Sequence, residues 1–154
     1  MVLQRWQSVY LFIAAVALLL STFLPVLELS GEATFVPLSL CAFWGDAAGF
    51  IVANGAEASL VYFILTGISG LLALVTIFKY KNLKLQKMLC SVILLLIIVA
   101  YIVIALFYKF VIDGIFGQWT VESLLPAFAL ICTYLAKTRI VHDDKLIHAA
   151  DRLR

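Results

Sequence analysis

The four long apolar runs of this sequence have no ionisable residue at their centres, although the chain contains nine acidic and eleven basic residues. Glu122 and Lys109 lie near the ends of such runs. Ionisable side chains are costly in lipid and are kept within membrane spans mainly for transport of protons or ions. Their absence argues against a proton-coupled transporter, although it does not exclude a pore formed by several copies of the chain.

Cysteine and histidine are scarce, and neither is spaced for a site. Cys41, Cys90 and Cys132 form no CxxC pair, so we interpret Cys90 and Cys132 as small buried residues. Cys41 is expected to be an unpaired thiol that is available to another chain. His142 and His148 are six residues apart and would lie on different faces of a helix. We therefore predict no metal site and no cofactor.

Several other signals are missing. No nucleophile stands beside a base, so we expect no enzyme. The acidic residues of the first loop match no calcium-binding motif. A net charge of +2 is too small to favour nucleic acid as a partner. Residues 25–29 provide no small-residue cleavage site, so the first apolar run is expected to stay in the protein.

The chain is otherwise rich in apolar residues. Its 154 residues are 65% hydrophobic and 13% charged, with a mean hydropathy of +1.12. A membrane-spanning helix needs about 20 such residues, and the sequence predicts spans at 9–27, 60–78, 88–110 and 121–136. Pro126 suits the last span if that helix begins close before it, with Thr120 or Ser123 as cap. The predicted fold is an all-α membrane protein, a four-transmembrane-helix bundle in one domain.

The basic residues indicate the orientation of the bundle. All of them except Lys109 fall before the first span, in the connector 79–87 or in the tail 137–154, whereas the loop 28–59 has four acidic and no basic residues. Lys and Arg near span ends favour the cytoplasmic side. Both termini and the connector are therefore expected in the cytoplasm, and the loop outside.

The outer loop carries two apolar segments, residues 35–44 and 50–53, around a glycine-bounded turn at 45–49. This pattern favours a short β-hairpin that caps the bundle, or an irregular loop on the lipid headgroups. Trp and Tyr favour membrane interfaces. We expect Trp6 and Tyr134 at the inner interface, and Tyr62 and Trp119 at the outer one.

Small residues recur at helical spacing in three of the spans and allow helices to approach closely. We expect them to pack within this bundle, with a dimer or a partner helix as the alternative, and no strict GxxxG motif decides between these. They are Ala14, Ala17, Ser21, Thr66, Gly70, Ala73, Ala129 and Thr133.

The last helix is expected to continue through Lys137 into an amphipathic cytoplasmic tail. On a helix, Ile140, Leu146 and Ile147 share an apolar side, and Asp144 belongs to the charged side. Such a tail can lie in the inner interface, pack beneath the bundle or dock a cytoplasmic partner. His142 and His148 are expected to be solvated, or paired with Asp144 and Arg152 at one-turn spacing.

Three segments carry a family resemblance: Gln-Arg-Trp-Gln-Ser-Val-Tyr-Leu at 4–11, Thr-Ile-Phe-Lys-Tyr-Lys-Asn-Leu-Lys-Leu-Gln at 76–86, and the terminal Asp-Arg-Leu-Arg. The chain resembles an uncharacterised family of small four-helix membrane proteins of Bacteroidetes, domain of unknown function 4293. It departs from that pattern at His148 and Ala149, where Arg and Ser are usual. The resemblance implies the inner membrane of a Gram-negative bacterium.

We therefore expect a non-enzymatic membrane protein that acts as a structural or accessory interaction subunit. Its partners would be the lipid bilayer and a membrane protein or a second copy. The alternative is a small uncoupled transporter or channel, lined by Ser21, Thr66, Ser69, Thr133 and tyrosines. The expected interaction surface is Arg5, Lys79, Lys81, Lys84, Lys87, Lys137, Arg139, Asp144, Asp151, Arg152 and Arg154.

Overall fold

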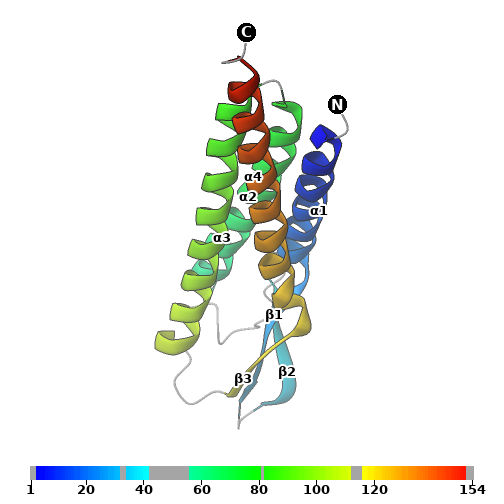
Figure 1. Ribbon diagram of the computed structural model, residues 1–154. Coiled ribbons are helices and arrows are strands. Elements are labelled where there is room, and N and C mark those ends of the chain that lie inside the picture. The colour runs from blue at the N-terminus through cyan, green and yellow to red at the C-terminus, as the bar shows by residue number, and fades with distance from the viewer. Residues whose placement is uncertain (1–2, 32–33, 42–55, 81, 112–115, 152–154) are drawn as a thin grey trace.

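The computed structural model is a bundle of four long helices with a three-stranded sheet at one end (Figure 1). It describes residues 3–31, 34–41, 56–80, 82–111 and 116–151. The elements are α1 (Leu3–Phe23), β1 (Pro25–Gly31), β2 (Thr34–Cys41), α2 (Ala56–Phe78), α3 (Leu83–Val111), β3 (Phe116–Trp119), the short 3-10 helix η1 (Val121–Ser123) and α4 (Leu124–Asp151).

All four helices are long and apolar enough to cross a membrane, which confirms the prediction of four such helices. Large apolar side chains on each helix lie on the outside, among them Phe12, Leu71, Leu95 and Phe128, each more than half exposed. In water such a surface would be unfavourable, whereas lipid tails are as apolar as these side chains.

The end of α1 and the start of α3 differ from the expected span boundaries. The first span was expected to reach residue 27, but α1 ends at Phe23 because Pro25 begins β1 and proline interrupts the helical hydrogen-bond pattern. The third span was expected to begin at residue 88, but α3 begins at Leu83. The Gln86 backbone N–H donates to the Asn82 carbonyl at 3.0 Å, which places Asn82 just before the first turn. The connector between α2 and α3 is therefore shorter than expected.

The helix α4 begins after η1, where the Ser123 hydroxyl donates to the Thr120 carbonyl at 2.7 Å. Pro126 lies in its first turn, where the missing N–H costs little. The helix then runs unbroken to Asp151. Ile140 is fully buried within the bundle, whereas Leu146 and Ile147 are half exposed. The expected apolar side of the tail is therefore divided between the bundle and the surface.

The sheet has the strand order β2-β1-β3, and both pairs are antiparallel. Glu28 of β1 stands opposite Ser39 on one side and Gln118 on the other. The predicted fold had only helices and a hairpin of residues 35–44 with 50–53. Instead, β2 pairs with β1, and the expected turn and second strand lie outside the described residues. Strand pairing brings the α1–α2 connection, which contains β1 and β2, beside the α3–α4 connection, which contains β3. No pattern within a single segment of the sequence predicts this contact.

Small residues fill the core of the bundle. Ala14, Ala17, Ala73 and Ala129 are buried in one cluster with larger side chains such as Ile93 and Ile97. A Cβ atom at Gly70 would lie 3.1 Å from the Leu19 side chain, so α1 and α2 approach closely there. Packing within this bundle accounts for the small-residue stripes.

The start of α1, the end of α4 and the helix ends on either side of the α2–α3 connector lie at one end of the bundle, and the sheet lies at the other (Figure 1). We call the first the basic end, because the Lys and Arg residues of the connector and tail belong to it. It holds those predicted interaction residues that the structure describes.

Candidate interaction surface at the basic end of the bundle

The basic end presents exposed cationic side chains from two segments. Lys79 and Lys84 flank the α2–α3 connector, and Arg139 and Lys145 lie on α4. All four are exposed, whereas Lys87 and Lys137 are half-buried. Charged side chains that carry no ion pair and face water are free to meet an anionic surface.

Some of the predicted surface cannot be described. Arg5 lies in the first turn of α1 and Asp151 is the last residue of α4, and only these helix positions, not the side chains, are described. Lys81, Arg152 and Arg154 lie outside the described residues.

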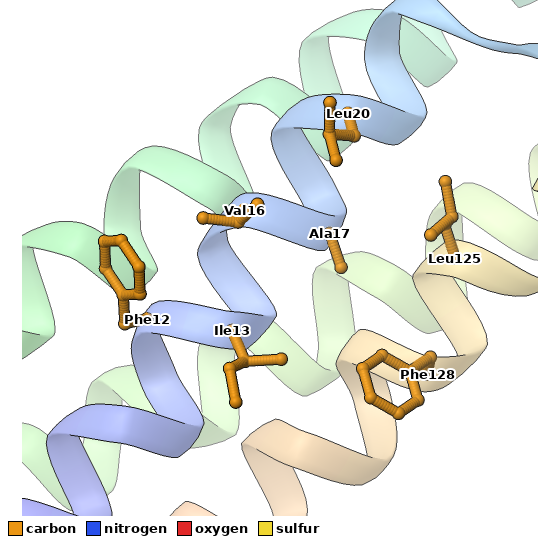
Figure 2. Close-up of a pocket in the computed structure, with 7 residues that line it drawn as sticks. All are labelled: Phe12, Ile13, Val16, Ala17, Leu20, Leu125 and Phe128. Carbon is orange, nitrogen blue, oxygen red and sulfur yellow. The ribbon is translucent and has the colours of Figure 1, made fainter.

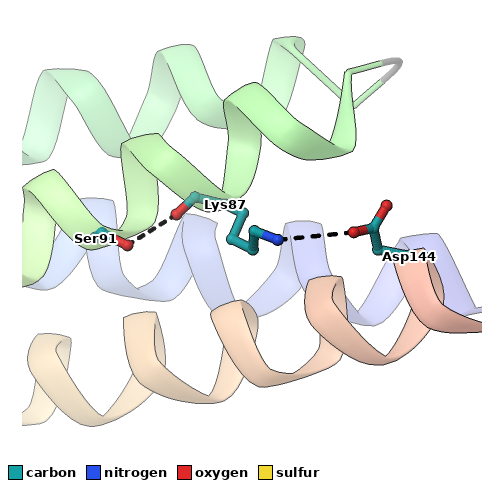
Figure 3. Close-up of polar contacts among 3 residues, drawn as sticks. All are labelled: Lys87, Ser91 and Asp144. Atoms are coloured by element: carbon teal, nitrogen blue, oxygen red, sulfur yellow. Dashed lines mark hydrogen bonds and ion pairs between the residues drawn. The ribbon is translucent and has the colours of Figure 1, made fainter.

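One ion pair joins α3 to α4. The Lys87 ammonium lies 3.7 Å from a carboxylate oxygen of Asp144, as Figure 3 shows. Ser91 supports the same turn of α3, since its hydroxyl donates to the Lys87 carbonyl at 3.1 Å. The Lys87 and Asp144 side chains are 43% and 21% exposed, so water screens the pair and its contribution to stability is below about 1 kcal/mol. Asp144 therefore pairs with a lysine from another helix, and the side chain of His148, one turn away on α4, lies outside the described residues.

A second polar contact joins α1 to α4. The Gln7 side-chain amide donates to the Asp143 carboxylate. Gln7 is 2% exposed and stands one turn from the fully buried Leu11. Asp143 has no ion-pair partner among the described residues. This hydrogen bond from a neutral amide is the polar contact described for Asp143.

A second buried polar side chain, Gln86 of α3, lies at the same level of the bundle as Gln7. Leu11, Cys90 and Ile140 pack in one cluster. Residues three or four apart share a helix face, so Gln7, Asp143 and Gln86 form the next layer toward the basic end. Gln86 is 1% exposed, and its Oε1 atom has no hydrogen-bond partner.

Gln7, Gln86 and Asp143 were not among the predicted site residues, because the prediction was based on charged residues at the surface. One signal was available in the sequence. Gln7 and Gln86 each precede an apolar run by one helical turn on its buried side, where a polar residue has to find a partner or stay unsatisfied.

The interior of the bundle offers no row of free hydroxyl groups in its described part. Ser21, Thr66, Ser69 and Thr133 are buried, and each donates to a carbonyl of its own helix at 2.8 Å. Tyr62, in the second turn of α2, is 1% exposed within the bundle, and its hydroxyl has no hydrogen-bond partner. These hydroxyl donors are therefore already used within each helix, except that of Tyr62.

Cysteines and histidines form no site in the described part of the chain. Cys90 and Cys132 are free and buried, and Cys41 ends β2. His142 is exposed on α4. No three His, Cys, Asp or Glu side chains come together among the described residues.

An apolar groove of about 280 Å³ lies between α1 and α4, away from the basic end (Figure 2). It is lined by Phe12, Ile13, Val16, Ala17, Leu20, Leu125 and Phe128. None of these side chains carries a polar atom, so the groove provides shape but no specific hydrogen bond to a ligand.

Comparison with known proteins places this fold in a family. A family model described as a domain of unknown function, DUF4293, matches residues 3–153. The chain belongs to the DUF4293 family. The match takes in all four helices and the sheet, so the whole bundle is the DUF4293 domain. No curated protein and no solved structure matches the chain.

Proposed function

We propose that this protein is a non-enzymatic subunit of the bacterial inner membrane that acts through contacts, with a second copy or as an accessory part of a membrane complex. The distribution of polar groups supports this proposal. The buried Ser and Thr hydroxyls are satisfied within single helices, whereas exposed Lys and Arg side chains gather at the basic end. The sequence resemblance further favours a member of the Bacteroidetes as the source.

The proposed orientation has both termini and the basic end in the cytoplasm. It is supported by the excess of Lys and Arg in the tail and the connector. The acidic loop and the sheet would then face the periplasm.

Two reporters fused after Arg154 test this orientation. A reporter that is active only in the cytoplasm is expected to be active, and a reporter that is active only in the periplasm is expected to be silent. Both fusions use the same junction, so differences in folding of the bundle cancel. Activity of the periplasmic reporter alone would contradict the proposed orientation.

Association through the basic end is tested by removing its exposed charges. We expect the solubilised wild-type protein to purify as a defined oligomer or with one stable partner. Replacing Lys79, Lys84, Arg139 and Lys145 by glutamine should weaken that association at least about fourfold, since each charge contributes about 0.2–1 kcal/mol. Cross-linking and size-exclusion chromatography measure the assembled fraction.

The matched control keeps the charges, with arginine at the three lysine positions. It is expected to associate like the wild type. Deleting residues 137–154 is a poorer test, because it removes the buried Ile140 as well as Asp143 and Asp144. Recovery of wild-type protein only as a monomer would count against the proposal.

A small transporter or channel is the competing hypothesis. It has less support, because the hydroxyl groups expected to line its path donate to their own helices. Solute flux into proteoliposomes that contain the purified protein would favour it.

A further inference from the structure

Lys137 of α4 is a charged residue within the apolar part of the bundle. It belongs to the apolar segment Val121–Ile147 and is half-buried. It lies close enough to the buried Cys90 of α3 for its charge to act on that thiol. In the described part of the chain, Lys137 has neither an ion pair nor a side-chain hydrogen bond. Charged residues within membrane helices are rare, and they are usually kept because they pair with another group.

The polar contacts at the basic end show how deep Lys137 lies. Asp143 accepts from Gln7, the second residue of the apolar segment Trp6–Phe23 of α1, so Asp143 stands at the edge of the apolar region. Counting from the other end of α4 gives the same edge, because the roughly 20 residues that cross a membrane reach from Leu124 to Asp143. Lys137 precedes Asp143 by six residues, which correspond to about 9 Å along the helix axis. Lys137 therefore lies well inside the apolar region.

A lysine side chain is too short to bridge this depth. Its five bonds of about 1.5 Å span at most about 6 Å when extended. In addition, the Cα–Cβ bond of a helical residue is tilted toward the N-terminus of its helix. The N-terminus of α4 lies at the end of the bundle that carries the sheet (Figure 1), so this bond leads away from the basic end. The ammonium of Lys137 therefore stays below the level of the lipid phosphates.

The carboxylates of the chain itself do not supply a counter-charge at this depth. Asp143 and Asp144 lie about two turns nearer the basic end, where Gln7 and Lys87 already engage them. Glu122 belongs to η1, at the opposite end of α4. A second copy in the same orientation would present these carboxylates at the same depths. The counter-charge would have to come from a different molecule.

The surface around Lys137 is suited to a membrane helix. Tyr134, one turn before Lys137, is 56% exposed. On α3, Leu94 and Ile98 follow Lys87 at seven and eleven residues, so they share the side of α3 that meets α4. Ile98 is 49% exposed and Leu94 is half-buried. Largely apolar side chains of both helices thus flank one unpaired cation, which is complementary to an apolar helix with one carboxylate.

We propose that Lys137 pairs with an Asp or Glu carboxylate on a transmembrane helix of another protein, which packs against α3 and α4. The inference rests on the proposed function and names the chemistry of the partner. Either charge alone is costly in lipid, so such a pair would favour this partner over helices without a carboxylate. A water-soluble acidic protein would instead meet the exposed Lys79 and Lys145, because it does not enter the apolar region.

Resonance energy transfer in phosphatidylcholine vesicles tests the pairing. The purified full-length protein carries the donor, and a leucine-rich transmembrane peptide with one glutamate, six residues inside its apolar stretch, carries the acceptor. The matched peptide has glutamine at that position. We expect the wild type to bind the glutamate peptide about tenfold more tightly, an effect that polar contacts between membrane helices can reach. Lys137→Met should bind both peptides equally, whereas Lys137→Arg should keep the preference.

Arg139→Gln is the control, because it removes an exposed charge two residues from Lys137, on another side of α4. It should keep the wild-type preference, and circular dichroism confirms that each variant folds. The proposal is overturned if the wild type shows no preference, if Lys137→Met retains it, or if Arg139→Gln loses it. A preference that disappears in phosphatidylglycerol vesicles would overturn it in favour of a lipid phosphate.

This inference and the proposed function fail separately. The peptide measurement involves no native partner, and the variant that lacks the four exposed charges keeps Lys137. Loss of association in that variant, together with equal binding of the two peptides by the wild type, would support the proposed function and contradict the pairing of Lys137.

Discussion

Replacing Gly70 by leucine is expected to destabilise the protein by about 3 kcal/mol, whereas the same change at Gly67 leaves it as stable as the wild type or more stable. A Cβ atom at Gly70 would already lie 3.1 Å from Cγ and Cδ2 of Leu19, and a leucine adds three more carbon atoms to that contact. Overfilling a packed core typically costs about 1–3 kcal/mol. A Cβ atom at Gly67 would meet nothing within 4 Å.

The two glycines lie three residues apart on one helix, so the pair controls for helix propensity. Leucine is a better helix former than glycine by about 0.5–1 kcal/mol, and both variants gain this term. Alanine at Gly70 should have a small effect, because the flexible Leu19 side chain can move by a few tenths of an ångström. Thermal unfolding in detergent, followed by circular dichroism, gives the order. Equal stabilities of the two leucine variants would show that α1 and α2 do not pack closely at Gly70.

Gln7→Leu and Gln86→Leu are expected to change stability in opposite directions. Gln7 donates to Asp143, so its loss leaves a carboxylate without its described donor, at a cost of about 1–3 kcal/mol. Gln86 is buried with an acceptor that has no partner, so leucine there removes an unsatisfied polar group. That change should be neutral or stabilising by up to about 1 kcal/mol.

The double replacement of Gln7 and Asp143 by leucine tests the cause of the first effect. If the loss in Gln7→Leu comes from the unsatisfied carboxylate, removing that carboxylate as well should restore most of the stability. A marked loss of stability in Gln86→Leu would show that Gln86 has a partner, such as a bound water molecule. Both outcomes are read from the same unfolding curves.

The helices could be predicted from the sequence to the extent that composition decides them. Runs of about 20 apolar residues can satisfy their backbone groups in lipid only as helices or closed barrels, and α2 and α3 contain the predicted spans 60–78 and 88–110. The ends were less predictable. Asn82 starts α3 early through a backbone hydrogen bond that a hydropathy pattern does not record, whereas Pro25, which ends α1, can be recognised in the sequence.

The sheet and the polar contacts at the basic end could not be predicted in this way. Glu28 and Gln118 are neighbours in the sheet although 90 positions separate them, and 136 positions separate Gln7 from Asp143. No periodicity within a single segment contains such a pairing. The predicted interaction surface included Lys87 and Asp144 as separate charged residues. Only the packing of α3 against α4 brings them together as an ion pair.

The sequence by itself determined that this chain has four apolar helices and that its basic residues collect in three segments, because both follow from composition along the chain. Only the tertiary structure decided which of those residues are exposed, which are paired, and which, like Lys137, are half-buried without a described counter-ion. Burial and pairing depend on distances between helices, and these are set by side-chain packing such as that of Gly70 against Leu19.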